Sequence, residues 1–182
     1  MSRPAGAQVM DVLTAPKTLV DRAIEARSSS DILKDNEIVA KVNAIMAKVG
    51  TIKASTEIYE QRLLITGIFS DKPTYDKFEH DVRQVTGVKK LYWHVIYMSE
   101  AEQKAKKLLD WVDVTEMSTK AQARLVGTAG VADVNYRTTA DPFGRVYIIG
   151  RARSKEEAAK ALARVRDGNG VKAVVNYVAV RP

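Results

Sequence analysis

One pattern occurs twice in this chain: an Arg, a short apolar run, a Gly, a turn and the start of a helix. It reads RLLITGIFSDKPT at 62–74 and RVYIIGRARSKEE at 145–157. Gly67 and Gly150 are 83 positions apart, and the Gly-Val pairs at 87–88 and 170–171 keep the same offset. Such a fixed spacing indicates that one structural unit is written twice. The roughly 20 residues between the two glycines of each copy suit a strand-helix-strand crossover.

Both copies predict the same order of elements from their apolar periodicity and turn residues. In the first copy we expect a helix, two hairpin strands, a helix and a strand, over 35–50, 51–60, 61–69, 71–87 and 88–98. In the second copy the same elements fall at 117–127, 131–140, 144–150, 154–170 and 171–180. A β-helix-β crossover makes its two strands parallel, whereas the hairpin adds an antiparallel strand. The predicted fold class is therefore α+β, with two tandem αββαβ units, each a small mixed sheet packed by two helices on one face.

Two further helices are expected outside the repeat. Pro16 opens a helical pattern that continues to Ile24, and SSSD at 28–31 predicts a break after it. Between the units, residues 100–116 predict a connecting helix that begins with a capping box at Ser99 and holds the units in a fixed relation. The predicted domains are an N-terminal segment, a first unit, the connecting helix and a second unit, at 1–30, 31–99, 100–116 and 117–182.

The predicted helix at 154–170 also begins with a capping box, formed by Ser154 and Glu157. The offset of 83 sets Ala158, Ala161 and Val165 of the second copy opposite Tyr75, Phe78 and Val82 of the first. The core of the second unit is therefore expected to be built from smaller side chains.

Charge distinguishes the two copies. The chain carries a formal charge of +7 at pH 7, and residues 117–182, with twelve basic and five acidic side chains, account for all of it. Such asymmetry indicates an anionic partner, either nucleic acid or an acidic membrane surface. The alternative is that the excess forms a solvated basic face. With 46% apolar and 28% charged residues the composition is that of a globular protein, and no apolar run reaches the roughly 18–20 residues of a membrane-spanning helix.

The sequence offers little chemistry for catalysis or metal binding. The absence of cysteine excludes disulfides, thiolate metal sites and cysteine nucleophiles. His80 and His94 belong to no cluster with zinc-site spacing, and no nucleophile-elbow sequence is present. We therefore expect no catalytic residue, no metal and no cofactor. Trp93 alternates with apolar neighbours and is predicted to lie in a core, whereas Trp111 could pack between the units or at an interface.

The elements and their residues resemble the BON domain, named for bacterial osmotic-stress and nodulation proteins. The first copy contributes DILKDNEIVAKV, RLLITGIFSDK and GVKKLYWHV. The second contributes KAQARLV, VADVNYR, GRVYIIGRARSKEE and GVKAVVNYVAV. The resemblance covers about residues 31–180 and implies a non-enzymatic protein that binds phospholipid and supports envelope integrity and tolerance of osmotic or membrane stress.

The segment EARSSSDILKDNEI also resembles the region before the first BON domain of exported outer-membrane lipoproteins. In those relatives a lipidated cysteine lies upstream, and this sequence has none. The resemblance implies a mature protein of the periplasm or the inner face of the outer membrane. The stretch MSRPAGAQVM lacks the apolar core of a signal peptide, so a cytoplasmic location stays open.

In membrane-binding relatives the second BON domain, and its first helix above all, contacts lipid. Carried onto this sequence, that helix is 117–126, where Lys120 and Arg124 share a face because they are four apart. Five basic side chains near an anionic leaflet, at about 1 kcal/mol each, would suffice for reversible docking if they shared one surface. The predicted lipid-binding residues are Met117, Lys120, Arg124, Arg151, Arg153 and Lys155. The alternative is that Lys120 and Arg124 form only the solvated side of a helix that packs on a core.

Two other functions stay open. GTAG at 127–130 has the form of the G-x-x-G loop with which KH domains clamp single-stranded RNA. That loop joins two helices in KH domains, whereas here a predicted strand follows, so Gly127 to Gly130 are predicted to be a helix end and a turn. The third possibility is a scaffold that binds another envelope protein through a sheet edge or the connecting helix.

Overall fold

The computed structural model describes residues 24–50 and 53–182. The helix expected between Pro16 and Ile24 lies, apart from its last residue, outside the described residues. The first unit contains α2 (Ser29–Val49), β1 (Ala54–Tyr59), β2 (Arg62–Phe69), α3 (Lys72–Arg83) and β3 (Lys90–Tyr97). A short helix, α4 (Glu100–Ala105), follows it. The second unit contains α5 (Trp111–Leu125), a 3-10 turn η1 (Asp133–Asn135), β4 (Tyr136–Ala140), β5 (Arg145–Ala152), α6 (Lys155–Arg166) and β6 (Ala173–Val180).

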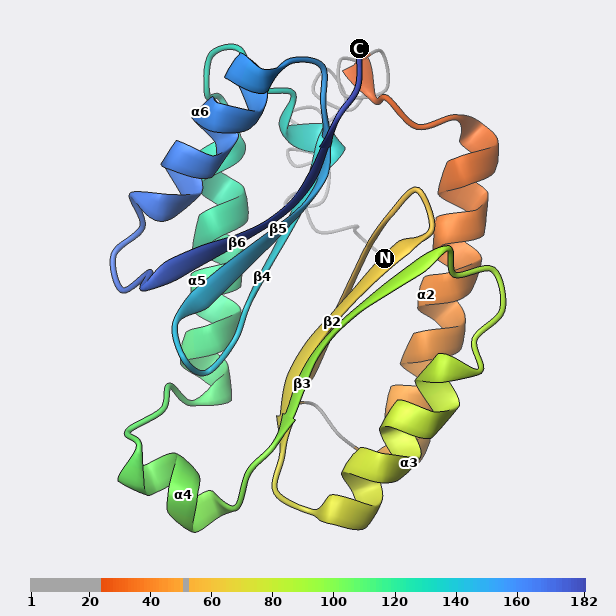
Figure 1. Cartoon of the computed structure of the whole chain (residues 1–182), viewed down its shortest axis with the longest axis vertical. Helices are drawn as coiled ribbons and strands as arrows, with labels where there is room; N and C mark the ends of the chain where they lie inside the picture. The colour runs from red at the N-terminus through yellow and green to blue at the C-terminus, as the bar shows by residue number, and fades with distance from the viewer. Residues whose placement is uncertain (1–23, 51–52) are drawn as a thin grey trace, which may run out of the picture.

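The predicted duplication is visible in the structure. The elements β2, α3 and β3 coincide, residue for residue at an offset of 83, with β5, α6 and β6. Each unit has a three-stranded sheet, in the order β1-β2-β3 or β4-β5-β6. The first two strands of each sheet are antiparallel and the last two are parallel. The α+β class and the two small mixed sheets with helices are therefore as predicted (Figure 1).

The repeated glycine allows two neighbouring strands to approach closely. A Cβ atom added at Gly150 would lie 2.1 Å from the carbonyl oxygen of Asn135, and one at Gly67 would lie 2.7 Å from the carbonyl oxygen of Lys53. Both obstacles are backbone atoms, which cannot rotate away. The glycine in each copy is thus required where the first strand of the hairpin begins to pair with the second.

The first helix begins earlier than predicted. Ser28 is the N-cap of α2, and its hydroxyl accepts a hydrogen bond from the N–H of Asp31 at 3.0 Å. The SSSD stretch therefore starts this helix, because serine satisfies the unpaired N–H groups of a first turn. The helix ends at Gly50, in the left-handed conformation, as predicted.

Asp35 of α2 holds the turn between β1 and β2. Its buried carboxylate accepts hydrogen bonds from the N–H groups of Glu60 at 3.0 Å and Gln61 at 2.7 Å, and from Arg27 at 3.0 Å. Glu60 and Gln61 both have positive φ angles, which non-glycine residues adopt at a cost. The carboxylate therefore compensates for strain in a turn that contains no glycine.

The helix predicted over 100–116 is wrong in extent. The capping box of Ser99 and Glu102 is present, but α4 ends at Ala105, and Lys107 then adopts a positive φ angle. A new helix starts at Trp111, because the Asp110 carboxylate accepts a hydrogen bond from the N–H of Asp113 at 2.8 Å. The first helix of the second unit therefore begins six residues before the predicted Met117.

Two local predictions for the second unit also need correction. The strand predicted over 131–140 starts only at Tyr136, because Asp133–Asn135 form the 3-10 turn. Ser154 caps α6 as predicted, accepting from the N–H of Glu157 at 3.1 Å. The Glu157 carboxylate does not complete a capping box, since it accepts from the N–H groups of Ala132 and Arg153 instead, each at 3.0 Å.

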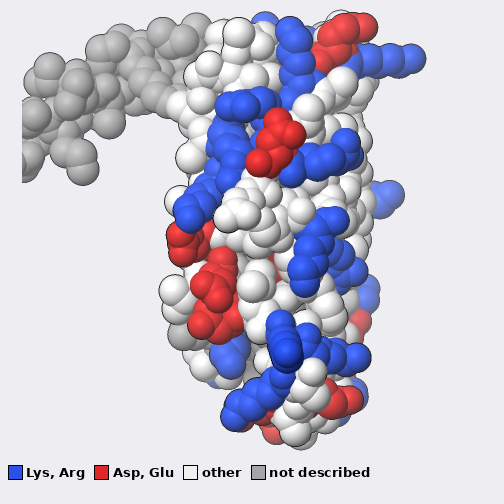
Figure 2. Space-filling model, turned by 90° about the vertical axis from the view of Figure 1, so that its left-hand side faces the viewer, with Lys and Arg blue, Asp and Glu red and all other residues white. Residues whose placement is uncertain are grey.

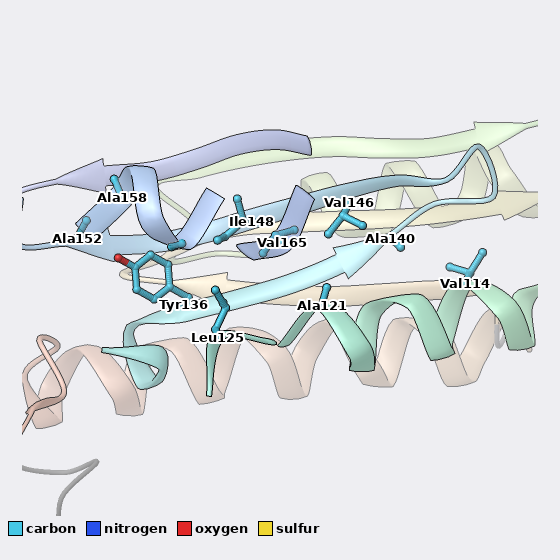
Figure 3. Close-up of a cluster of buried hydrophobic side chains, with 11 residues drawn as sticks. Val114, Ala121, Leu125, Tyr136, Ala140, Val146, Ile148, Ala152, Ala158 and Val165 are labelled. Carbon is cyan, nitrogen blue, oxygen red and sulfur yellow. The ribbon is translucent and has the colours of Figure 1, made fainter. Parts of the chain in front are cut away.

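Each unit has its own core between its helices and one face of its sheet. In the first core, Phe78 and Val82 of α3 meet Ile58, Leu63 and Ile65. In the second, the predicted small side chains Ala158, Ala161 and Val165 are buried against Leu125 and Tyr136. Figure 3 shows these side chains converging between α5, α6 and the strands β4 and β5.

The other faces of the two sheets pack against each other, so the helices of both units lie on the outside (Figure 1). Tyr59, Leu64, Tyr147 and Ile149 form a fully buried cluster between the sheets. Arg62 of the first unit donates hydrogen bonds to the carbonyl oxygens of Tyr177 at 2.8 Å and Gly150 at 2.7 Å. The fixed relation of the units thus comes from direct contact between the sheets, and not from the connecting helix.

Candidate functional site

Helix α6 presents basic side chains with few acidic neighbours. Ala158, Ala161 and Val165 face the core, and the exposed positions of the helix include four basic residues, Lys155, Lys160, Arg164 and Arg166. Among the described residues, no carboxylate lies within 4.0 Å of the charged atoms of any of these four side chains. These four positive charges are therefore free to interact with an anionic ligand or surface.

The equivalent helix of the first unit neutralises its cations. In α3, Lys72 pairs with Asp76, Lys77 pairs with Asp81 at 2.8 Å, and Arg83 pairs with Glu79 at 2.6 Å, all four residues apart.

The positions at the offset of 83 show the source of this difference. Asp76, Glu79 and Asp81 of α3 correspond to Ala159, Leu162 and Arg164 of α6. The second copy thus keeps the cations at positions 155, 160 and 166 and lacks these three acids. Its remaining carboxylate four residues from one of these cations is Glu156, which precedes Lys160 and makes no ion pair with it within 4.0 Å.

Three cations lie along the seam between α6 and the segment that follows α5. Arg164 Nε donates to the hydroxyl of Thr128 at 3.4 Å, and Lys160 Nζ lies 3.1 Å from the position that a Cβ would take at Gly130. The guanidinium of Arg124 lies against Gly168, where its Nη1 would be 2.6 Å from an added Cβ. We call Arg124, Lys160 and Arg164 the basic seam.

Figure 2 shows the side of the molecule that carries α5 and α6, with α4 at its lower end. Lys and Arg side chains are spread over this face from top to bottom, whereas the acidic side chains are fewer and their largest group lies toward the left edge. Basic side chains therefore outnumber acidic ones over much of this side of the molecule.

The structure changes the role of the residues predicted on the first helix of the second unit. Met117 is partly buried against the second core, so it does not project from the surface. Lys120 is exposed but forms an ion pair with Glu116, one turn earlier. Arg124 is half-buried and belongs to the basic seam.

The other three predicted residues lie just before α6 or in its first turn. Arg151 is held between the units, with its Nη1 3.5 Å from Glu60 and its Nη2 donating to the carbonyl oxygen of Pro182 at 2.6 Å. Arg153 pairs with Glu157 at 3.0 Å, and Lys155 is exposed in the first turn of α6.

The four basic residues Arg124, Arg151, Arg153 and Lys155 lie toward the two ends of α6. Arg124 lies by Gly168, after the end of α6, whereas Arg151 and Arg153 precede its start. A 12-residue helix separates the two groups, and at 1.5 Å per residue it is about 18 Å long. Lys160 and Arg164 were not among the predicted residues. Comparison of the two copies would have found them, because Arg164 stands where the first copy has Asp81.

The Glu157 carboxylate is committed to structure. Burial alone would raise its pKa, but the hydrogen bonds from the N–H groups of Ala132 and Arg153 and from the Arg153 side chain hold the pKa below its ordinary value. It therefore keeps its negative charge and offsets Arg153, so it does not neutralise the cations of α6.

The remaining motifs take structural positions. Gly127 and Gly130 have positive φ angles in the turn after α5, so GTAG ends a helix as predicted. Trp93 packs on the first core, and Trp111 packs partly on the second. The His94 ring lies 2.7 Å from the hydroxyl of Tyr177 between the sheets, where burial and the charge of Arg145 lower its pKa.

Within the described residues, no group of three or more His, Asp or Glu is placed to hold a metal ion. No helix in the same part of the chain combines the length and apolarity needed to cross a bilayer.

The fold and this surface define an α+β protein with two similar units, one of which carries a basic helical face. Residues 113–182 match the BON domain family, so a BON domain forms the second unit. The match begins within α5 and takes in the whole of α6.

No curated protein matches the chain. Two solved structures are similar in part, both of CdsD, a structural protein of the type III secretion system of Chlamydia trachomatis. The first is 12% identical, covers 80% of this chain and 93% of its own, and has a TM-score of 0.31. The second, its C-terminal domain, is 12% identical, covers 80% and 98%, and has a TM-score of 0.33. At these TM-scores the similarity carries no argument about this chain.

Proposed function

We propose that the second unit docks reversibly on anionic phospholipid surfaces through the basic seam and Lys155, which lies in the first turn of α6. The observation that supports this most is the contrast between the equivalent helices. The cations of α3 are paired with acids four residues away, whereas those of α6 have, among the described residues, no carboxylate within 4.0 Å. The BON domain at 113–182 adds support, since its resemblance to known members implies phospholipid binding.

The size of the interaction suits reversible binding. Each Lys or Arg near an anionic leaflet contributes about 1 kcal/mol, and salt screens that contribution within a Debye length. Arg124, Lys155, Lys160 and Arg164 together would contribute about 4 kcal/mol, which is a millimolar interaction on the usual scale. Docking should therefore be weak for one molecule and sensitive to both salt and lipid charge.

The proposed role in the cell rests on the resemblance of the chain to BON-domain proteins. The first unit, with the same element order, would be a second BON domain. The protein would act without catalysis in the cell envelope, at the periplasmic side of the outer membrane, and would support envelope integrity under osmotic or membrane stress. Membrane attachment through a lipid anchor in a longer form of the protein would add to the charge interaction.

The test exchanges one residue of α6 for its counterpart in α3. Arg164→Asp gives Lys160 the acidic partner that Lys77 has in the first unit, and it changes the charge of the seam by two units. Binding to vesicles of phosphatidylcholine and phosphatidylglycerol should weaken by about 2 kcal/mol, or roughly 30-fold, in a flotation assay at low salt.

The matched control is Arg83→Asp, the same substitution on α3. It removes an exposed ion pair with Glu79, which is worth little to stability, and leaves α6 unchanged. Membrane docking through α6 predicts that this variant binds almost as the unchanged protein does, and that neutral vesicles bind neither. Equal loss in both variants, or no binding to acidic vesicles at all, would rule out the proposed surface. Binding of single-stranded RNA in place of vesicles would favour the KH-like alternative.

A further inference from the structure

A cavity of about 680 Å³ opens between the two units, where β1 faces α5 and β4. This volume is within the range of small-molecule sites, roughly 300–1,000 Å³. Its apolar lining includes Trp111, Val114 and Val126, and its charged lining is Glu57 of β1 and Arg137 of β4. The cavity lies outside the basic seam and plays no part in the proposed membrane docking.

Glu57 is the unusual group in this cavity. On β1 its neighbour Ile58 belongs to the first core, so the alternation of the strand directs Glu57 to the opposite face, toward the second unit. The side chain is half-buried, and among the described residues it makes no hydrogen bond and no ion pair within 4.0 Å. Burial raises the pKa of Glu57 to about 7, although the positive charge of Arg137 acts in the opposite direction.

Several polar groups around Glu57 already have hydrogen-bond partners. Ser118 donates to the carbonyl oxygen of Val114 at 2.9 Å and accepts from the N–H of Ala140 at 2.9 Å.

The next polar side chains are engaged in the same way. Gln122 donates to the carbonyl oxygen of Tyr136 at 3.3 Å and contacts the hydroxyl of Thr138 at 3.2 Å. Arg137 donates through Nη1 to the carbonyl oxygens of Val134 at 2.8 Å and Tyr136 at 2.7 Å. The half-buried carboxylate of Glu57 thus receives no hydrogen bond from Ser118, Gln122 or Arg137, and partial burial of a carboxylate without a hydrogen-bond partner is unfavourable.

We propose that this cavity binds a small organic cation, an alkylammonium group with a short apolar body, with Glu57 as its counter-ion. The ammonium group would donate to the unpartnered carboxylate, and the apolar body would contact Val114, Val126 and the indole of Trp111. Trp is the aromatic side chain that attracts cations most strongly. A metal ion suits the site less well, because the cavity lining supplies one carboxylate and no histidine.

The proposal predicts a particular dependence on pH. The charged groups that line the cavity are Glu57 and Arg137, and the lining residues of α5 are all uncharged. With a pKa of about 7, the ionised fraction of Glu57 rises about tenfold between pH 6 and pH 8. Affinity for the cation should therefore rise about tenfold over the same range, since only the carboxylate form can pair with it.

The experiment titrates the whole chain with n-butylammonium and follows its amide resonances by NMR. Saturable shifts are expected for residues that line the cavity on β1 and α5, with a dissociation constant about tenfold lower at pH 8 than at pH 6. Neutral 1-butanol should show no such pH dependence. Glu57→Gln keeps the shape and removes the charge, so it should weaken butylammonium binding at least tenfold and abolish its pH dependence.

The matched control is Glu116→Gln, the same substitution on the exposed side of α5, which should leave the titration unchanged. Addition of phosphatidylethanolamine vesicles distinguishes the source of the ammonium group: Glu57-dependent shifts at the cavity indicate a lipid headgroup, and shifts with butylammonium alone indicate a soluble amine. Absence of saturable shifts at the cavity, or equal binding by the Glu57→Gln variant, would overturn the proposal. Arg164→Asp should not affect this titration, so failure here and failure of membrane docking are separable.

Discussion

At the scale of single residues, we expect the largest effects of substitution at two kinds of position. One is a glycine that lies against a neighbouring backbone, and the other is a carboxylate inside the fold. The strand that begins at Tyr136 passes so close to Gly150 that a methyl group there would overlap the carbonyl oxygen of Asn135. The repeated glycine is therefore a packing requirement of the hairpin, and the same holds more mildly at Gly67. Asp35 and Glu57 are the two carboxylates of this kind. The carboxylate of Asp35 accepts several hydrogen bonds, whereas that of Glu57 accepts none among the described residues.

Gly150→Ala should destabilise the protein more than Gly67→Ala. The added Cβ meets a backbone oxygen at 2.1 Å in the first case and at 2.7 Å in the second, so the strands must separate further at Gly150. Overpacking of this kind costs about 1–3 kcal/mol, and we expect Gly150→Ala at the upper end. Urea denaturation of both variants measures the difference. Equal stability of Gly150→Ala and the unchanged protein would show that β4 does not approach β5 as described.

Glu57→Gln should make stability less dependent on pH. The folded state raises the pKa of Glu57 from 4.5 to about 7, so it holds a proton that the unfolded chain releases between these values. The stability of the unchanged protein should therefore fall as pH rises from 4.5 to 7, and this part of the loss should be absent in the variant.

At 1.36 kcal/mol per pKa unit the gain of the Glu57→Gln variant above pH 7 is at most about 3 kcal/mol. Thermal or urea denaturation of both proteins between pH 5 and pH 8 gives the comparison. A variant less stable than the unchanged protein at pH 8 would mean that the carboxylate has a favourable partner in the fold.

At the scale of elements, the predictions succeeded where local signals act alone. Ser99 and Ser154 begin their helices as predicted, and the marker glycines locate the two hairpins. The predictions failed where a contact between residues distant in sequence determines the local structure. VADVNY has the composition of a strand, yet Ala132 donates to Glu157 and Asn135 donates to the carbonyl oxygen of Ile24, which holds this stretch in a turn. The start of α5 was a different error, since the capping residue Asp110 was visible in the sequence.

The same distinction explains the candidate site. That the second copy is basic could be read from its residues, but which cations are free could not. Arg151 forms an ion pair with Glu60, which lies 91 positions earlier in the chain. No local sequence pattern predicts such a pair. Arg164 has no acid four positions away, and it replaces the acid that would pair with Lys160 as Asp81 pairs with Lys77, which is local information that an alignment of the two copies would have supplied.

At the scale of the whole molecule, the unexpected feature is the contact between the two sheets. The strands β2 and β5 are covered by helices on one side and by the other sheet on the opposite side, so almost all of their residues are buried. Their continuous apolar sequences, LLITGIF and VYIIG, are typical of strands buried on both faces. That signal was present in the sequence and predicts a second covered face, although it does not say what covers it.

The two units should therefore unfold together. Trp93 reports on the first unit and Trp111 on the second, so the variants Trp111→Phe and Trp93→Phe each leave one reporter. In each variant the fluorescence transition in urea should coincide with the transition seen by circular dichroism. Leu64→Asp, which introduces a charge into the fully buried cluster between the sheets, should separate the two transitions. Non-coincident transitions without that substitution would mean that the units fold independently.

The orientation of the whole molecule on a membrane shows whether α6 is the docking helix. Bicelles that contain phosphatidylglycerol and a gadolinium-chelating lipid broaden the amide resonances of residues close to the bilayer. We expect the strongest broadening on the exposed side of α6 and in the turn at residues 127–130, with α3 and α2 unaffected because they lie on the opposite side of the molecule (Figure 1). Broadening concentrated on the helices of the first unit, or none under conditions of low salt, would contradict this expectation.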